Sequence, residues 1–374
     1  MKFIEVSDLK IGMRLARPIY SEKGVLLFER DSKLTKQAIE SARNFGLLGV
    51  YILEPAEPLP PVSEEDLEFE RFQIMSVFSI QAELEKIVTT KKQSKMESIV
   101  GTITKKYGHV NGKVNFYQNL RSKDDYICRH TLNTAILCAL ITHTMNLMPE
   151  EQGQTVLAAL VHEIGKTQVS KEMLFDREDV AENRERLYQV QLQGLDILEE
   201  AFSEGKTLKR ICMPALRSQY DFSVYNKVDT NVRLSNATKI LMVANRYDEM
   251  TAMNLQGKSE SEIKAIWEFR DHPELYDVRV VDALLKSVNI LIPGVSVELS
   301  SGDKALVLVE NEADVLRPML LNFRDNSILD LSLRRNKDIR IVDIMKTLDN
   351  RYVMDMEAMK EAMEQAKLAK TEES

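Results

Sequence analysis

From about residue 94 to about residue 291, apolar side chains recur at helical spacing in nearly every segment. Two clear runs lie at 132–140 and 156–164, where apolar residues repeat every three or four positions. A period of 3.6 residues places such side chains along one side of an α-helix. A stretch of this length can enclose a hydrophobic core of its own. The sequence therefore predicts an all-α domain at residues 94–291.

The N-terminal residues alternate short strand-like runs with turns around one helical stretch. We predict a small α/β or mainly β module at residues 1–53. The sequence EPAEPLPP at 54–61 cannot continue a helix or a sheet, because proline lacks an amide donor. A helix is expected to begin at Ser63, where a capping hydroxyl precedes three acids, and to end near Lys92. Residues 54–93 are interpreted as a linker and a connecting helix.

After Pro293 apolar and polar residues alternate, which is the pattern of half-buried strands. The sequence SSGD at 300–303 separates two such runs and predicts a hairpin turn. We predict a small β module at 292–346. Residues 347–374 are expected to form a C-terminal helix and tail. The methionine-rich face of this helix either packs against its own chain, which is the simpler interpretation, or contacts a partner. The chain is therefore expected to be mainly α, with small β-containing modules at both ends.

Composition and charge exclude several classes of protein. The formal net charge is −8 and basic residues are scattered among acids, so no nucleic-acid partner is expected. No apolar run approaches the ~20 residues of a membrane-spanning helix, and the first residues lack the pattern of a secretion signal. We expect a cytoplasmic protein without a membrane partner. Three cysteines, Cys128, Cys138 and Cys212, lie in apolar segments without a CxxC pair, which favours buried thiols.

The strongest local signal for chemistry is the sequence LVHEIGK at 160–166. His162 and Glu163 interrupt an apolar helical run, and burying ionisable groups is costly unless they are paired or bind a metal. A buried histidine that is hydrogen-bonded to an acid explains this motif about as well. His130 begins another apolar helix, and on its own it is more typical of a core residue than of a metal ligand.

Together these segments resemble the HD superfamily of metal-dependent phosphohydrolases, in particular its HD-GYP branch, which hydrolyses cyclic di-GMP. HTLN at 130–133 is similar to the family's first histidine and the Ser/Thr-x-Asn after it. HEIGK at 162–166 resembles the name-giving His-Asp-x-Gly-Lys, and VANRYDEMT at 243–251 resembles a later segment that begins Val-Ala-Asp. The flanking β modules are similar to those around HD-GYP domains of Gram-positive anaerobic bacteria. The resemblance implies an HD-GYP-like helical fold for residues 94–291.

The family holds two or three metal ions with several histidines and carboxylates, because a hydroxide bridging the metals is the nucleophile. By this resemblance, the family's ligand positions correspond here to Glu163, Val190, Arg217, Ser218, Asn245 and, for a glutamate of some members, Tyr126. The GYP loop is replaced by DFSVYNK at 221–227. Arg217 would place a permanent positive charge where a cation should lie.

Histidines are also too few for a two-metal centre, since the chain has five and none lies between His162 and His272. We predict that no catalytic site is intact and that Lys166 is a remnant of it. The remnants of the metal site are His130, His162, Glu163 and Asn245. We expect no cofactor, or at most one weakly bound divalent ion such as iron, manganese or nickel.

Three functions remain open at this point. The first is a degenerate HD-GYP-like signalling protein, a regulator or sensor in which Lys166 and Arg217 bind cyclic di-GMP or a related nucleotide. The second is a residual metal-dependent phosphodiesterase or other phosphohydrolase with one ion, and the third is a protein-interaction scaffold. An open, positively lined cleft would favour ligand binding, whereas a cleft plugged by Tyr126 or Tyr220 would favour the scaffold. A protein partner is expected, and the helix near 64–92 would either form a homodimer or pack within its own chain.

Overall fold

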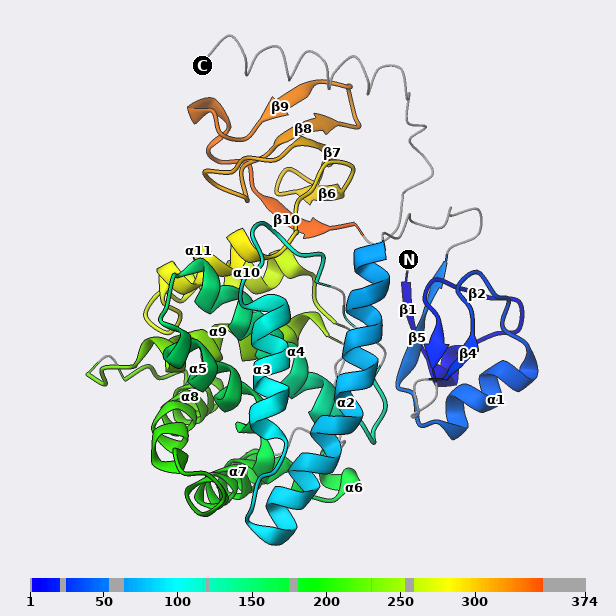
Figure 1. Cartoon of the computed structure of the whole chain (residues 1–374). Helices are drawn as coiled ribbons and strands as arrows, with labels where there is room; N and C mark the ends of the chain where they lie inside the picture. Colours follow the sequence, from blue (N-terminus) through cyan, green and yellow to red (C-terminus); the bar gives the residue numbers. More distant parts are fainter. Residues whose placement is uncertain are drawn as a thin grey trace.

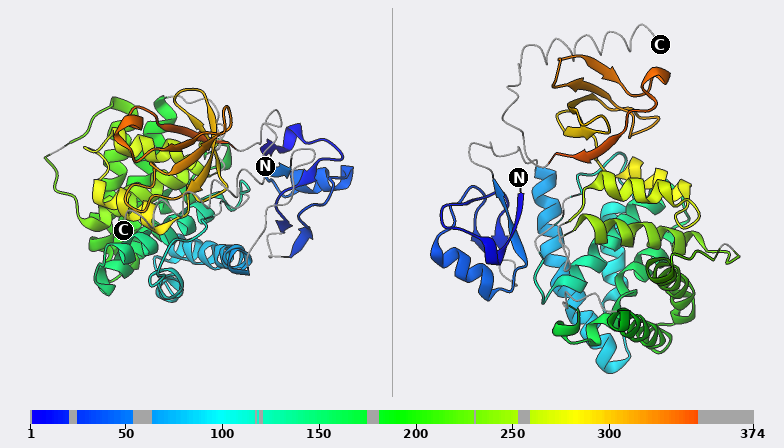
Figure 2. Two further views of the ribbon diagram at one scale, coloured as in Figure 1. Left: turned by 90° about the horizontal axis from the view of Figure 1, so that it is seen from above. Right: turned by 180° about the vertical axis from the view of Figure 1, so that it is seen from behind.

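The computed structural model describes residues 2–20, 25–53, 64–116, 118, 121–174, 181–229, 231–252 and 259–345. Helices fill the centre of the molecule, a small α/β unit lies beside them, and a β-sheet lies at one end of the helical bundle (Figures 1 and 2). The predicted mainly α fold with two small β-containing modules is therefore confirmed. The predicted linker at 54–61 and C-terminal helix at 347–374 lie outside the described residues.

The N-terminal module is built on an antiparallel sheet of order β1-β5-β2. Its elements are β1 (Lys2–Glu5), the 3-10 turn η1 (Val6–Asp8), β2 (Arg14–Leu15), β3 (Ile19–Tyr20), β4 (Leu26–Phe28), α1 (Lys36–Asn44) and β5 (Gly49–Leu53). Thr35 caps α1, because its hydroxyl oxygen accepts a hydrogen bond from the Ala38 amide at 3.1 Å. Leu15, Leu34 and Val50 belong to a hydrophobic core that is separate from the core of the helical bundle. This module therefore packs around a core of its own.

The central domain consists of helices packed around α4. The elements are α2 (Glu64–Thr90), α3 (Met96–Tyr107), α4 (Tyr126–Thr144), α5 (Pro149–Val161), η2 (Ile164–Gln168), α6 (Lys171–Leu174), α7 (Ala181–Ala201), α8 (Gly205–Tyr225), α9 (Asn236–Thr251), α10 (Glu262–Asp271) and α11 (Val278–Ser287). Every residue of α4 from His130 to Thr142 is buried, so other helices must surround it. Its neighbours include α5 and α9, whose side chains are thereby brought to it. None of the helices in the described ranges is long and apolar enough to cross a membrane.

The helix predicted to begin at Ser63 begins at Glu64 and ends at Thr90. It does more than connect two modules, because Val77, Ile80 and Leu84 are buried in the core that includes α3 and α4. The same core continues into the C-terminal sheet. α2, the bundle and the C-terminal module therefore share one hydrophobic interior.

Two glycines allow the segment after α5 to approach α7 closely. Gly165 in η2 lies against the backbone of Val190, and Gly194 on α7 faces the backbone of Gly165. A methyl group on either glycine would collide with main-chain atoms of the other segment. This contact fixes the chain just after His162 and Glu163.

The C-terminal module is an antiparallel sheet of order β10-β6-β7-β8-β9. Its elements are β6 (Ser296–Leu299), β7 (Lys304–Val309), β8 (Met319–Asn322), β9 (Ile328–Asp330), the 3-10 turn η3 (Arg334–Asn336) and β10 (Ile341–Ile344). The predicted hairpin turn is confirmed, since Gly302 has a φ of +81° between β6 and β7. The Trp267 indole on α10 donates a hydrogen bond to the Ile341 carbonyl at 2.7 Å and so joins this sheet to the bundle.

Candidate metal centre

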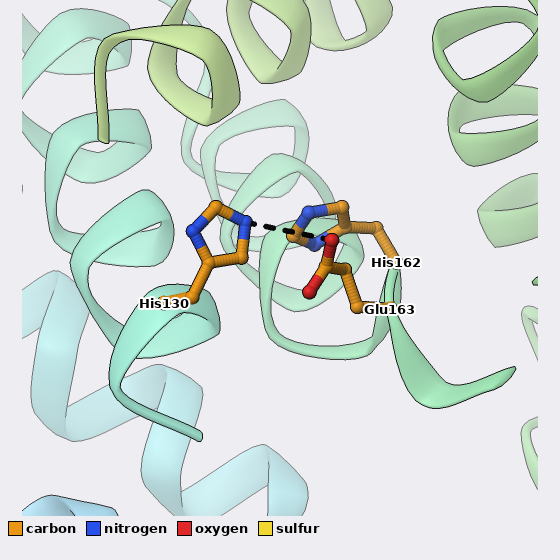
Figure 3. A group of neighbouring side chains, drawn as sticks. All are labelled: His130, His162 and Glu163. Atoms are coloured by element: carbon orange, nitrogen blue, oxygen red, sulfur yellow. Dashed lines mark ion pairs between the residues drawn. The ribbon is translucent and has the colours of Figure 1, made fainter. Parts of the chain in front are cut away.

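The ends of two neighbouring helices bring three ionisable side chains together (Figure 3). His130 lies in the second turn of α4, while His162 and Glu163 follow the last residue of α5. One ligand atom from each of the three residues lies within 4.8 Å of the others. His130 and Glu163 are only 1% and 3% exposed, so their polar atoms need partners or an ion. The structure thus brings together three of the residues that the sequence indicated as remnants of a metal site.

The Nδ1 atom of each of the two histidines takes part in a hydrogen bond. His130 Nδ1 lies 2.6 Å from a carboxylate oxygen of Asp248. His162 Nδ1 lies 2.7 Å from the carbonyl oxygen of Ala159. Because these oxygens only accept, each Nδ1 carries the hydrogen and donates it. In a neutral imidazole this leaves a lone pair on Nε2, ready to bind a metal.

Both Nε2 atoms point at the same oxygen. The Asn245 Oδ1 atom lies 2.7 Å from His130 Nε2 and 2.8 Å from His162 Nε2. The amide nitrogen of Asn245 donates to Glu249 at 3.1 Å and to Gln219 at 3.2 Å, so its oxygen faces the histidines. Two imidazole lone pairs and an amide oxygen repel one another unless a proton or a cation lies between them. Imidazole nitrogen and neutral oxygen are both ligands of divalent metals.

Protons on the two histidines would relieve only part of this repulsion between acceptor atoms. Burial lowers the pKa of His162 and favours its neutral form. Burial also opposes the charged form of His130, but the carboxylates of Glu163 and Asp248 outweigh it and raise the pKa of His130. A proton between these groups is therefore favoured on His130 over His162. By its geometry, this cluster could hold one cation.

Glu163 adds a carboxylate to the cluster. Its Oε1 atom lies 3.8 Å from His130 Nε2 and also accepts from the Lys166 ammonium, whereas Oε2 is buried without a hydrogen-bond partner among the described residues. Burial by itself would raise the pKa of Glu163, but Lys166 and the two histidines lower it to about 2. An ionised oxygen without a partner is costly in a protein interior. This orphan atom is a second sign that the cluster accommodates a cation.

The cluster opens into a cavity of about 950 Å³, which is large enough for a nucleotide. Its charged lining residues are Lys123, Asp124, Glu163, Lys166, Arg184, Arg246, Glu249, Glu260, Lys264 and Glu268. Tyr126 and Tyr220 form part of the wall and leave the cavity open. The cavity is therefore open and of mixed charge.

Arg217 does not belong to this site. Its side chain is 71% exposed and forms an ion pair with Asp221 at 3.6 Å, outside the set of residues that line the cavity. On the same helix Gln219 lines the cavity instead. Two positions along an α-helix turn the side chain by about 200°, so an alignment that is wrong by two residues selects the opposite face. The expectation that Arg217 occupies the place of a cation is therefore corrected. On α7, Gln191 lines the cavity and Val190 does not.

Sequence reasoning missed the buried network that holds His130. Both oxygens of Asp248 accept from Arg121, at 2.7 and 2.6 Å, and one accepts from Gln118 at 3.1 Å and from Asn133 at 2.9 Å. We call these four residues the Asp248 network. Burial would raise the pKa of Asp248, but Arg121 and His130 hold it well below its usual range.

One member of this network could have been found from the sequence. Asp248 lies three residues after Asn245 on α9, so both side chains share a helix face. Arg121 lies 127 positions away from Asp248, and no local pattern signals their contact. Gln219 and Glu249, which hold the amide of Asn245, were also missed.

Residues 115–280 match the model of the HD domain family. The matched region includes His130, His162, Glu163 and Asn245, and the HD domain family includes metal-dependent phosphohydrolases. This match supports the predicted relation of the central helices to the HD superfamily. No curated protein matches the chain.

Proposed function

We propose that this chain is a catalytically silent, HD-GYP-like signalling protein whose cavity binds cyclic di-GMP or a related nucleotide. The ligand set is the observation that carries the proposal. Within the described residues, one group of histidine, cysteine and acidic side chains converges closely enough to hold an ion, namely His130, His162 and Glu163. Two-metal hydrolysis needs a second ion about 3.5–4 Å from the first.

The walls of the cavity support binding without turnover. Helices α7 and α8 turn Gln191 and Gln219 toward it, and neutral amides are weaker metal ligands than imidazoles or carboxylates. The cavity is open, which supports ligand binding over a scaffold with a filled cleft, but its charged lining is mixed and not the positive lining expected for a binding cleft. Lys166 is 23% exposed and lines the cavity, where its ammonium is placed to contact a phosphate.

A single divalent ion would be held by His130, His162, Glu163 and the amide oxygen of Asn245. When bound, it would supply positive charge for a phosphate group. The protein's own part is to orient these ligands. Asp248 and the Ala159 carbonyl fix the Nδ1 hydrogens, and this sets the direction of both Nε2 lone pairs.

Lys166→Met is expected to weaken cyclic di-GMP binding about tenfold, because a charge-assisted contact to phosphate is lost. Arg217→Met is the matched control and should bind like the wild type, since its side chain lies outside the cavity. Isothermal titration calorimetry of the full chain at about 100 μM, with Mn²⁺ and with EDTA, measures both variants. No heat from the wild type in either buffer, or equal losses in the two variants, would contradict the proposal.

Turnover separates this proposal from a second candidate, a residual phosphohydrolase with one metal. The convergence of two Nε2 atoms, an amide oxygen and an orphan carboxylate oxygen favours that candidate. Purified protein would be loaded in turn with manganese, iron and nickel, and products would be separated by chromatography. We expect intact nucleotide throughout. If the wild type forms a product and His130→Ala does not, the second candidate replaces the first proposal.

A signalling role also predicts a protein partner and a cytoplasmic location, and both remain predictions. A homodimer through α2 remains open as well. Leu67 and Met75 are 38% and 66% exposed on that helix, while its other face is buried in the core. Sedimentation velocity of the wild type and of Met75→Lys would distinguish a dimer from a helix that packs only within its own chain.

A further inference from the structure

The Asp248 network connects the cluster of His130, His162 and Glu163, called the histidine cluster below, to Gln118 and Arg121, in the segment that precedes α4. The side chain of Arg121 and that of Asp248 are both fully buried, and they form an ion pair at 2.6 Å. Gln118 also contacts Asp248, as well as the hydroxyl of Thr251 at 3.0 Å. Asp248 in turn holds His130 Nδ1. The side chains of this segment thus set the position of one histidine of the cluster.

The backbone of the same segment is held by the N-terminal module. Arg17 donates to the carbonyl of Gln118 at 2.7 Å. The Leu48 amide donates to the carbonyl of Arg121 at 3.2 Å. In the other direction, the Lys123 amide donates to the carbonyl of Gly46 in the module at 3.3 Å. An antiparallel bridge pairs Leu47 of the module with Ser122 of this segment, between these bonds. The module lies beside α2 in two views from opposite sides, next to this part of the bundle (Figures 1 and 2).

The inner and outer contacts meet at the same two residues. The carbonyl oxygens of Gln118 and Arg121 accept hydrogen bonds from the N-terminal module. The side chains of the same two residues donate hydrogen bonds to Asp248. Two nitrogens of Arg121, Nε and Nη1, are buried without a hydrogen-bond partner in the part of the chain that the structure describes. Its guanidinium also lies 5.1 Å from the ring of Tyr126, which lines the cavity. Arg121 is thus held in place by its backbone and Asp248, with few other polar contacts.

We propose that docking of the N-terminal module positions the histidine cluster, with Arg121 as the positioning residue. When the module is docked, the segment is clamped and Arg121 holds Asp248 and, through it, His130. When the module leaves, the segment loses its backbone partners, and a buried carboxylate that loses its counter-ion is strongly destabilised. The two arrangements differ in the order of the cluster, so a partner that binds the docked and the undocked module with different affinities shifts the affinity of the cluster for its ion.

Arg17→Met tests this coupling, because it removes the donor to Gln118 and keeps the apolar stem of the side chain. Arg43→Met is the matched control, since Arg43 is exposed on α1 of the same module. The first readout needs no metal: hydrogen–deuterium exchange in peptides from α4 and α9 of the full chain. We expect faster exchange around His130 and Asp248 in Arg17→Met, the wild-type pattern in Arg43→Met, and partial recovery in Arg17→Lys.

The second readout is Co²⁺ binding, followed by calorimetry and by the visible absorption of the ion, and it alone rests on the proposed function. Outer-sphere changes commonly cost ten- to hundredfold in metal affinity, and we expect about three- to tenfold for Arg17→Met, which lies one contact further out. Wild-type exchange around His130 in Arg17→Met overturns the coupling, as does an equal effect in Arg43→Met. If the wild type binds no Co²⁺ but exchange responds to Arg17→Met, the metal site fails and the coupling stands.

Discussion

At the scale of single residues, Glu83 shows how a buried carboxylate ties two helices together. It lies on α2 and is 3% exposed. It accepts from the Lys95 amide at 2.8 Å, from the Ser94 hydroxyl at 3.0 Å and from the Ser94 amide, at the turn that leads into α3. Burial would raise the pKa of Glu83, but these hydrogen bonds lower it. The contribution to stability therefore depends on the ionised form.

Glu83→Gln is expected to lower the free energy of unfolding by about 1–2 kcal/mol at pH 7, because charge-assisted hydrogen bonds are lost. Since the folded pKa is depressed, this stabilisation is present above the unfolded value of 4.5 and disappears as the pH falls through the folded value. Urea unfolding at pH 7 and near pH 3.5 measures it. Glu85→Gln, on the exposed side of α2, is the control. A difference between Glu83→Gln and the wild type that stays constant with pH would contradict this account.

Among the elements, the contact between η2 and α7 fixes the segment that directly follows His162 and Glu163. Gly165 and Gly194 let two backbones approach without side chains between them. His162 and Glu163 stand immediately before this contact, at the end of α5. Their direction thus depends on how closely the two segments pack.

Gly165→Ala is expected to lower the free energy of unfolding by about 1–3 kcal/mol, because the added methyl group overlaps the backbone of Val190. Gly153→Ala is the control on α5, where a methyl group meets no atom. That variant should raise stability by up to about 1 kcal/mol, since alanine favours a helix. Urea unfolding of both variants tests the opposite signs. Equal changes would mean that close packing at Gly165 is not required.

The elements were predicted better than the site. Local periods indicated the helical centre, the α2 helix and the β6–β7 turn, since each depends on residues that are close in the sequence. His130, His162 and Glu163 were recognised because polar groups stood out in apolar runs. Gln219 and Arg121 were missed, because their roles depend on helix rotation and on contacts across more than a hundred positions.

At the scale of the whole molecule, the described residues form two main cores of unequal size. One belongs to the N-terminal module, and the other runs from α2 through the bundle to the C-terminal sheet. The helical bundle and the C-terminal sheet are therefore expected to unfold together, while the N-terminal module can open first. Such an order would allow the module to leave while the bundle stays folded.

Differential scanning calorimetry should resolve two transitions. Leu34→Ala creates a cavity in the N-terminal core, and it should lower only the first transition. Ile80→Ala, in the bundle core, should lower the second. Each change is expected to cost about 2–5 kcal/mol within its own unit. A single transition that both variants shift equally would show that the two cores unfold as one.

The neutral amide of Asn245 affects the net charge of any ion together with its ligands in the cluster. Glu163 brings one negative charge, and the imidazoles and the amide bring none. A divalent ion would keep a net charge of +1 (+2 − 1), where a second carboxylate would cancel it. An ion with surplus charge is held loosely by its protein ligands and attracts anions strongly. The metal and an anionic guest would then each raise the occupancy of the other.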